Sequence, residues 1–468
     1  MSARPELIRG LTLLGAIAIN VGDMVGTGVF LKARVMTCNV GSAGSVLLVW
    51  LAAGLLTLAG SFAYAELAAM MPEAGGSYLY LRRAFGRLFG FLYGWTFVLL
   101  GTAGAQAALA VGFAIFINVL SGGALAQWHV GFSALGHPLR LSGLTLLALA
   151  LLWLVALINC VSVSGGGRIA VVLFWIKVAI VLLIGSAGFA LARGSFAQLA
   201  ASAVNGSCED VAASARGGIA GFGAAMLGAL WAYDGWNNVA PMIGELKDPE
   251  RNVPRAFIIS TLLVAGLYLF VNAAYFYVLT PTQVASVSAH SAVATEVMRR
   301  FLGPMAVACT AVALALCSFG ALYASTLANS RVPFAMARGG LFFQALGKLN
   351  RRSHVPVRSI LAQCGWASLL ALSGTYDTLT DSLIFAEWLF YGLTVAALLR
   401  LRRVEPAAKR PYRAAGQPAL SLIFLAVTVA LILNTFVATP HQASQGVIIV
   451  LTGLPFYLYW SRRTPATA

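Results

Sequence analysis

Long runs of apolar residues dominate the chain, and short polar or charged stretches separate them. A helix needs roughly 20 apolar residues to cross the hydrocarbon core of a bilayer, and about twelve runs reach that length. The pattern therefore predicts an all-α integral membrane protein without a separate soluble domain. The expected spans are 10–34, 41–70, 86–120, 141–162, 168–192, 217–244, 255–279, 302–332, 355–374, 379–400, 418–438 and 446–461.

Two of these runs are interrupted near their centres. In the first run Gly26 and Gly28 flank Thr27, and in the sixth run Asp234 is followed by Gly235. In lipid every backbone amide and carbonyl must find a partner within the protein, so a break at mid-depth needs a reason. Amides at the N-terminus of a half-helix can bind a carboxylate, and free carbonyls can bind an amine or a cation. We interpret the two breaks as a binding site of this kind.

The positions of the breaks favour a transporter. The interrupted runs are the first and the sixth, five spans apart, and such a pair in two halves of a chain indicates inverted repeats around a central site. The alternative is packing, because Gly22 and Gly26 also form a small-xxx-small pair. Trp231 and Trp236 bracket the second break, where they either pack or close over a bound molecule. The second break shifts our interpretation toward a site.

Composition and charge agree with a membrane protein. Hydrophobic residues make up 60% and charged residues 10% of the chain, and soluble proteins contain about 25% charged residues. The net charge of +16 could indicate nucleic acid binding. Most lysines and arginines, however, fall in alternate loops between the expected spans. This positive-inside bias predicts a multi-pass protein of the plasma (inner) membrane with both termini in the cytoplasm. The charge then favours contact with anionic lipid, and no nucleic acid partner is expected.

Three charged residues lie inside the spans: Asp23, Lys177 and Asp234. Each costs about 2.5–3.5 kcal/mol at the bilayer centre, so each needs a partner or access to water. Lys177 can reach the interface or form an ion pair, or its ammonium can satisfy the free carbonyls of the first break in place of a sodium ion. Asp23 can pair with Lys177, and Asp234 can end a helix. If they do neither, the two carboxylates line a pocket that attracts a cationic group.

Other chemistry has little support in the sequence. The six cysteines show no CxxC spacing, and the five histidines lie in or beside loops without an HExxH motif. We therefore expect no disulfide framework, no metal, no cofactor and no catalytic residue, and the chain is not predicted to be an enzyme. Glu66 and Glu387 lie nearer to the ends of their spans, which favours structural or gating roles.

With these residues in view, the chain resembles the amino acid–polyamine–organocation superfamily, and within it the L-type amino acid transporter branch. The resemblance extends from about Leu7 to Trp460, and its motifs occur in order on the expected spans. They are Val25–Phe30, Pro72–Tyr78, Arg82–Gly86, Trp231–Asn237, Glu245–Ala256 and the segment from Ala324–Ser325 to Ser330–Arg331.

The resemblance implies a LeuT-type fold with discontinuous first and sixth helices. Residues 1–400 would then form a ten-helix core of five-plus-five inverted repeats, near 10–192 and 217–400, and residues 401–468 would add two C-terminal helices. It also implies sodium-independent transport of L-amino acids by alternating access. The competing hypotheses are a polyamine or amine permease and a membrane sensor that binds amino acids without moving them.

The resemblance also implies roles for single residues. The substrate carboxylate would bind the backbone at Met24, Thr27 and Gly28. The amine would bind the carbonyls of Trp231, Ala232 and Asp234, with Trp231 as the gate. Lys177 matches the span-5 lysine of sodium-independent members and would replace a sodium ion.

Two features modify this picture. The sequence Trp-Ala-Tyr-Asp at the second break is similar to members that accept cationic and neutral amino acids, and Asp23 replaces the uncharged residue that most relatives carry. Both favour a cationic substrate.

Eukaryotic relatives bind a glycoprotein subunit through a cysteine after span 3, but Ser121–Arg140 contains no cysteine. We therefore expect no disulfide-linked heavy subunit and a prokaryotic origin.

Overall fold

The computed structural model describes residues 7–134, 137–202, 206–288, 291–373, 376–438 and 440–463. Almost all of its secondary structure is helical. The elements in chain order are α1 (Leu13–Met24), α2 (Gly28–Val40), α3 (Ala43–Met70), α4 (Ser77–Phe85), α5 (Arg87–Thr96), the π-helical segment η1 (Phe97–Thr102), α6 (Ala103–Leu120), α7 (Ala124–Gln127), β1 (His129–Ala134), β2 (His137–Ser142), α8 (Gly143–Asn159), α9 (Val163–Leu191), η2 (Phe196–Ala200), η3 (Ala213–Ala215), α10 (Gly218–Ala232), η4 (Ala240–Glu245), α11 (Pro249–Val278), α12 (Pro281–Ala285), α13 (Val293–Leu302), α14 (Met305–Asn329), α15 (Arg331–Arg338), η5 (Gln344–Gly347), α16 (Val357–Ser373), α17 (Tyr376–Val404), α18 (Ala419–Ala438) and α19 (Pro440–Arg463).

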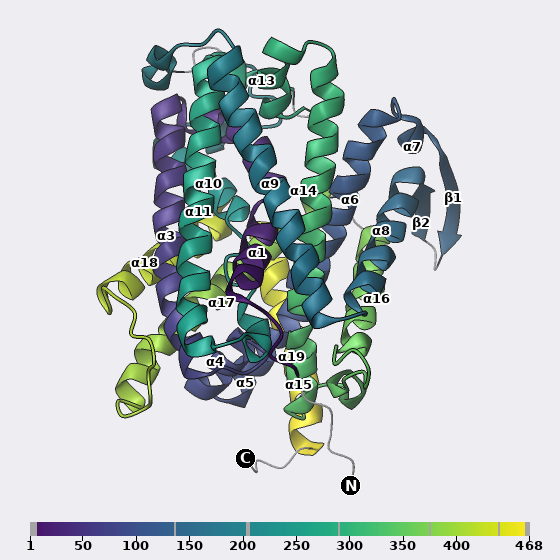
Figure 1. The fold of residues 1–468 in the computed structure, drawn as a ribbon, viewed down its shortest axis with the longest axis vertical. Coiled ribbons are helices and arrows are strands. Elements are labelled where there is room, and N and C mark those ends of the chain that lie inside the picture. Colours follow the sequence, from purple (N-terminus) through teal and green to yellow (C-terminus); the bar gives the residue numbers. More distant parts are fainter. Residues whose placement is uncertain are drawn as a thin grey trace.

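The long helices form a bundle around the first broken span. Helix α1 packs against α9, α11 and α14, and α3 and α6 extend this core through contacts with α11 and α14. Helices α3, α9, α11 and α14 run along the long axis of the molecule, and α18 lies outside α3 (Figure 1). The most buried helices are therefore those next to the two breaks.

The prediction of an all-α membrane protein is confirmed in outline. Among the described residues, seven helices are long and apolar enough to cross a membrane, and α1 and α2 pass the same test as a pair that is bent by 43°. The hairpin β1–β2 is an exception that the hydropathy pattern did not predict. It pairs His129 with Ser142 in antiparallel register and projects from one side of the bundle beside α7 and α8 (Figure 1).

The two breaks form because their backbones approach each other closely. Helix α1 ends at Met24 and α2 begins at Gly28. A Cβ atom on Gly28 would lie 2.7 Å from Cβ of Ala232, the last residue of α10. Gly235 has a φ of +92°, and a Cβ atom there would lie 2.6 Å from Cβ of Asp23. Both glycines are thus required by contact between the first and the sixth span.

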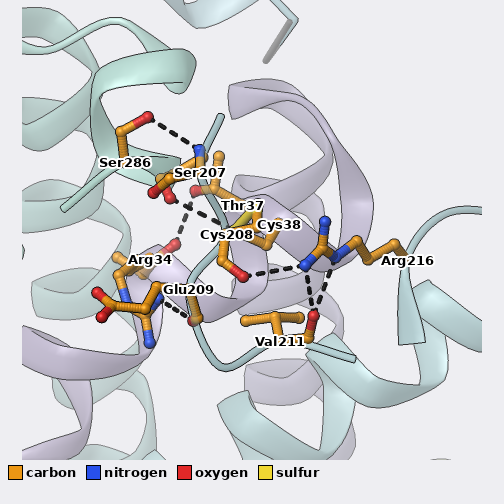
Figure 2. Close-up of a disulfide and its surroundings, with 11 residues drawn as sticks. Arg34, Thr37, Cys38, Ser207, Cys208, Glu209, Val211, Arg216 and Ser286 are labelled. Carbon is orange, nitrogen blue, oxygen red and sulfur yellow. Dashed lines mark hydrogen bonds between the residues drawn. A yellow bond between two sulfur atoms is a disulfide. The ribbon is translucent and has the colours of Figure 1, made fainter. Parts of the chain in front are cut away.

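The structure corrects the expectation that the cysteines are unpaired. A disulfide joins Cys38 near the end of α2 to Cys208 in the loop before α10 (Figure 2). The two residues are 170 positions apart, so a search for short cysteine spacings could not find them. Cys208 lies in the segment 193–216, in which no short sequence motif is found.

Hydrogen bonds around the disulfide attach the same loop to its neighbours. Arg34 donates to the carbonyl of Glu209 at 2.6 Å, and Arg216 donates to the carbonyls of Cys208 and Val211 (Figure 2). The amide of Cys208 donates to the carbonyl of Ala285 at the end of α12. The disulfide therefore belongs to a cluster that connects α2, the loop before α10, and α12.

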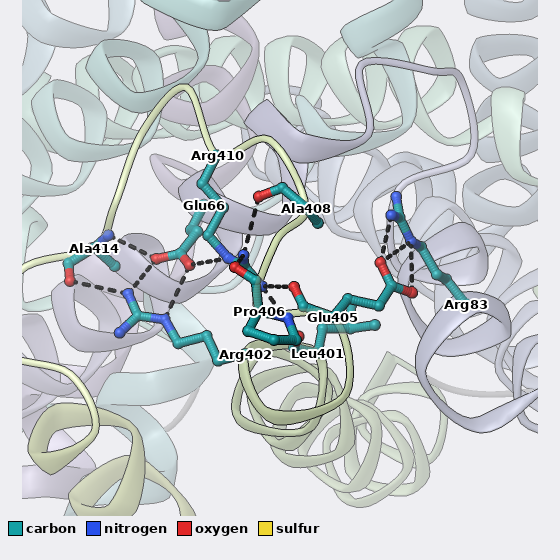
Figure 3. A network of polar contacts seen from close by, with 9 residues as sticks. All are labelled: Glu66, Arg83, Leu401, Arg402, Glu405, Pro406, Ala408, Arg410 and Ala414. Atoms are coloured by element: carbon teal, nitrogen blue, oxygen red, sulfur yellow. Dashed lines mark hydrogen bonds and ion pairs between the residues drawn. The ribbon is translucent and has the colours of Figure 1, made fainter.

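Glu66 is a structural residue at the other end of α3. Its buried carboxylate accepts hydrogen bonds from the Arg402 guanidinium and from the amide of Ala414, at 2.7 Å, and it forms an ion pair with Arg410 (Figure 3). These contacts fix the segment after α17 against α3. Nearby, Arg83 binds Glu405 on the surface, and this hydrogen bond keeps the pKa of the Glu405 carboxyl below its ordinary value.

A fully buried ion pair fixes the segment that follows the second break. Glu245 at the end of η4 accepts from Nε of Arg331 at 2.7 Å and from Nη2 at 3.0 Å, and neither side chain is exposed. The carbonyl of Glu245 also accepts from the amide of Leu11, just before α1. The start of the first span, the end of the sixth and α15 are thereby held together.

Candidate functional site

A cavity lies between the two breaks and is lined on its other sides by residues of η1, α6, α14 and α17. Its walls combine backbone from both breaks with three acidic side chains. The lining residues are Asp23, Met24, Gly26, Thr27, Gly28, Phe97, Gly101, Thr102, Ala105, Leu109, Trp231, Ala232, Asp234, Asn238, Ser325, Asn329 and Glu387. Every residue that the sequence assigned to substrate binding therefore lies at one cavity, although the binding roles remain predictions.

Lys177 lies behind this cavity, against the first break. Its Nζ donates to the carbonyl of Val25 at 2.8 Å and to the carbonyl of Gly22, and the side chain is fully buried. A Cβ atom on Gly320 of α14 would lie 2.5 Å from Cε of Lys177, so this glycine leaves room for the lysine. The ammonium thus occupies the position where free carbonyls at the end of a half-helix attract a cation.

The structure decides between the two interpretations of Asp23. No salt bridge joins Asp23 to Lys177. The Asp23 carboxylate accepts instead from Nδ2 of Asn238, which follows the second break. Asp23 also lines the cavity. The Asp23 carboxylate is therefore available to a molecule in the cavity, while the Lys177 ammonium donates to backbone carbonyls of the first break.

Asp234 likewise belongs to the cavity wall. Its carboxylate accepts a hydrogen bond of 2.6 Å from the hydroxyl of Tyr391 on α17. Glu387, one helical turn before Tyr391, lines the same cavity. Sequence analysis assigns Glu387 only a structural or gating role, because its distance from the end of a span carries no information about its neighbours on other helices.

The helix end at Gly28 and the indole of Trp231 complete the site. Gly28 is the first residue of α2, and the first amides of a helix lack an intrahelical acceptor. Trp231 packs against Leu100 and Ala386 and lines the cavity, so it is placed where a gate would act. Trp236 is different, because it is buried against the ring of Tyr64, 4.6 Å away between centroids.

Tyr268 of α11 is a site residue that the sequence did not reveal. Its hydroxyl lies 2.6 Å from the carbonyl of Met24 and 2.7 Å from the carbonyl of Ala232, the last residues of α1 and α10. The same hydroxyl group is therefore the hydrogen-bond donor to a carbonyl at each of the two breaks. A tyrosine in an apolar span gives no sequence signal that separates this role from packing.

We expect Tyr268→Phe to slow transport of all substrates to a similar extent. The change removes only the hydroxyl, and it leaves two buried carbonyls without their donor, at a cost of about 1–3 kcal/mol. Uptake efficiency in proteoliposomes should fall about five- to 100-fold. Tyr412→Phe, outside the spans, is the matched control. An unchanged rate would show that the hydroxyl does not hold the breaks.

Comparison with known proteins agrees with this geometry. Residues 11–459 match the model of a family described as amino acid permease. Asc-type amino acid transporter 1 of Mus musculus is 30% identical over 463 residues, which cover 98% of this chain and 83% of that protein. Large neutral amino acids transporter small subunit 2 of Mus musculus is 32% identical over 98% of this chain and 82% of its own length.

A third relative extends the comparison to another transporter type. The b(0,+)-type amino acid transporter 1 of Mus musculus is 28% identical over 454 residues, which cover 97% of this chain and 88% of that protein. The match to the family model and to these relatives covers both breaks, Lys177 and α17. The chain therefore belongs to the amino acid permease family, within the amino acid–polyamine–organocation superfamily, and its relatives are transporters of the L-type branch.

Proposed function

We propose that this protein is a sodium-independent transporter of L-amino acids, an exchanger or permease that works by alternating access. The observation that carries the proposal is the contact of Lys177 with the carbonyls of Gly22 and Val25. Free carbonyls at such a break are where coupling ions bind in transporters with broken helices. A lysine ammonium at this position makes a sodium ion unnecessary.

The proposed architecture is a LeuT-type core of five-plus-five inverted repeats, followed by two further spans. It is supported by the order of the helices and by breaks in the first and sixth of about twelve spans. The positive-inside bias supports both termini in the cytoplasm and a location in the plasma (inner) membrane. In this arrangement the cavity lies near the middle of the bilayer.

Substrate binding uses both breaks at once. The α-carboxylate binds the backbone at Met24, Thr27 and Gly28, where the N-terminus of α2 provides backbone amides and a favourable dipole. The α-ammonium binds the carbonyls of Trp231, Ala232 and Asp234. A carbonyl has two acceptor positions, so Ala232 can serve the substrate as well as Tyr268. Trp231 closes over the bound molecule.

The acidic cavity supports a preference for cationic amino acids. Asp23 and Asp234 both line the cavity, and neither forms a salt bridge with Lys177. The side chains that donate to these carboxylates, Asn238 to Asp23 and Tyr391 to Asp234, are neutral. A substrate with a positively charged side chain adds the missing countercharge. Neutral amino acids bind at the backbone and remain substrates.

We expect uptake of labelled arginine and leucine into proteoliposomes to be the same with and without sodium. In Asp23→Asn combined with Asp234→Asn, arginine uptake should fall about tenfold or more while leucine uptake changes less, because a charge-assisted hydrogen bond contributes about 1.5–3 kcal/mol. Strict sodium dependence would overturn the role of Lys177. Equal arginine uptake by wild type and double variant would overturn the role of the carboxylates.

A second candidate function is a polyamine or amine permease, which the acidic cavity also favours. Putrescine would then compete with labelled arginine better than any amino acid does. A sensor that binds amino acids without moving them would show binding but no flux in the same vesicles. The proposed function predicts flux, and stronger competition by lysine and arginine than by putrescine.

The relatives raise the question of a partner subunit. One of them is named a small subunit, but the loop Ser121–Arg140 of this chain contains no cysteine, and Cys38 and Cys208 are bonded to each other. We propose that this protein acts without a disulfide-linked heavy subunit. Its remaining partners are the amino acid substrate and membrane lipid.

A further inference from the structure

A second, smaller cavity adjoins the substrate cavity between α5, η1 and α17. Aromatic rings form most of its wall: Tyr93, Phe97, Phe390 and Tyr391. It shares Phe97, Gly101 and Glu387 with the first cavity. The carboxylate of Glu387 therefore lies at the junction between a polar chamber that contains both breaks and an aromatic chamber beyond it.

The backbone opposite Glu387 is shaped to keep this junction open. Residues Phe97–Thr102 form a π-helical segment within a long span, and such segments occur frequently at functional sites. Gly101 lies on this segment, and a Cβ atom there would be 3.1 Å from the Phe97 ring and 3.5 Å from Oε1 of Glu387. Any side chain at position 101 would fill the junction.

Two unsatisfied hydroxyls indicate that this region binds a polar group. Thr96 lines the aromatic chamber and Thr102 lines the substrate cavity. Both side chains are almost fully buried, and neither hydroxyl has a hydrogen-bond partner in the described part of the chain. Buried polar atoms are normally bonded, so a ligand with donors is a suitable partner for both.

We propose that Glu387 determines charge specificity by binding the cationic end of the substrate side chain. The inference rests on the proposed function, in which the α-carboxylate and α-ammonium lie at the two breaks. The side chain then extends past Gly101 toward Glu387. The substrates are amino acids with a positive group at the end of a long aliphatic chain, such as lysine and arginine.

The chemistry of the two chambers fits such a side chain along its length. Its methylene groups pack against apolar surface while the charged end remains with polar groups. The ammonium or guanidinium reaches Glu387 and Asp234, which both line the substrate cavity, and its positive charge attracts both carboxylates. Phe97 and Phe390 line the aromatic chamber, and aromatic rings attract a nearby cation.

The test compares lysine with norleucine, which is lysine without its side-chain ammonium. Vmax/KM of both labelled amino acids is measured in proteoliposomes for wild type, Glu387→Gln, Glu387→Asp and Glu405→Gln. Glu387→Gln removes the charge with little change in shape, and Glu387→Asp retains it. Glu405→Gln is the same chemical change just beyond the other end of α17, at a surface residue remote from both chambers.

We expect wild type to prefer lysine and Glu387→Gln to lose about tenfold or more of the lysine-to-norleucine ratio. Norleucine uptake itself should stay within about twofold of wild type. Glu387→Asp should keep most of the preference, and Glu405→Gln all of it.

The possible failures are distinguishable. Equal loss of lysine and norleucine uptake in Glu387→Gln would make Glu387 a structural residue and overturn the inference. A wild type that transports norleucine but not lysine would overturn the inference and leave amino acid transport standing. A wild type that transports neither these two nor any other amino acid would overturn the proposed function itself.

Discussion

Replacement of Lys177 by methionine is expected to abolish transport of cationic and neutral amino acids alike. Methionine fills similar space but cannot donate to the carbonyls of Gly22 and Val25, both of which Lys177 contacts in the structure. A hydrogen bond to a charged donor contributes about 1.5–3 kcal/mol. Loss of two such bonds at the substrate site corresponds to a decrease in uptake of about 100-fold or more.

The test of this role includes a rescue. Uptake by Lys177→Met and Lys177→Ala is measured in sodium, in potassium and with methylammonium, and the exposed Lys348→Met serves as the matched control. The space left by alanine can admit a small cation, so partial recovery in sodium or methylammonium is expected for Lys177→Ala alone. Undiminished uptake by Lys177→Met in sodium-free buffer would contradict the role of the ammonium.

Removal of Arg331 is expected to have the largest effect on stability. The Arg331–Glu245 pair is fully buried, with two hydrogen bonds of 2.7 Å and 3.0 Å. Breaking a buried pair from one side leaves an uncompensated charge and costs about 3–5 kcal/mol. Arg331→Met and Glu245→Met should therefore each lower the apparent Tm strongly in detergent.

A double-mutant cycle tests this explanation. Arg331→Met with Glu245→Met removes both charges, so the double variant should be more stable than the sum of the single effects predicts. Lys409→Met is the control, because the Lys409–Glu250 pair is largely exposed and such pairs contribute about 0–1 kcal/mol. Fully additive losses would show that the two charges act independently.

The breaks and the charged residues near them could be predicted from sequence, because glycine pairs and charged residues are unusual inside long apolar runs. A glycine pair or a lysine inside a run of about 20 apolar residues is costly in a membrane, so it usually has a functional reason. The structure places Asp23 and Asp234 at one cavity and Lys177 against the first break, while their binding roles stay predictions. The sequence left open whether Asp23 pairs with Lys177, and only the three-dimensional contact with Asn238 resolved that question.

Contacts between distant helices could not be predicted in the same way. Tyr268 holds both breaks through one hydroxyl, yet it is one of many aromatic residues in the spans. Glu387 and Tyr391 join the site because α17 packs next to α6 and η1. The hydropathy pattern does not show which helices are neighbours. The disulfide was missed because its cysteines are separated by several spans.

That disulfide makes a closed covalent ring out of the chain from Cys38 to Cys208, and the ring contains α3 to α9. During synthesis the ring can close only after α9 has been inserted and the following loop has crossed the membrane. Disulfides form in oxidising compartments, so closure takes place on the non-cytoplasmic side in the proposed topology. The bond can therefore form only in a chain whose first half has been inserted in this direction.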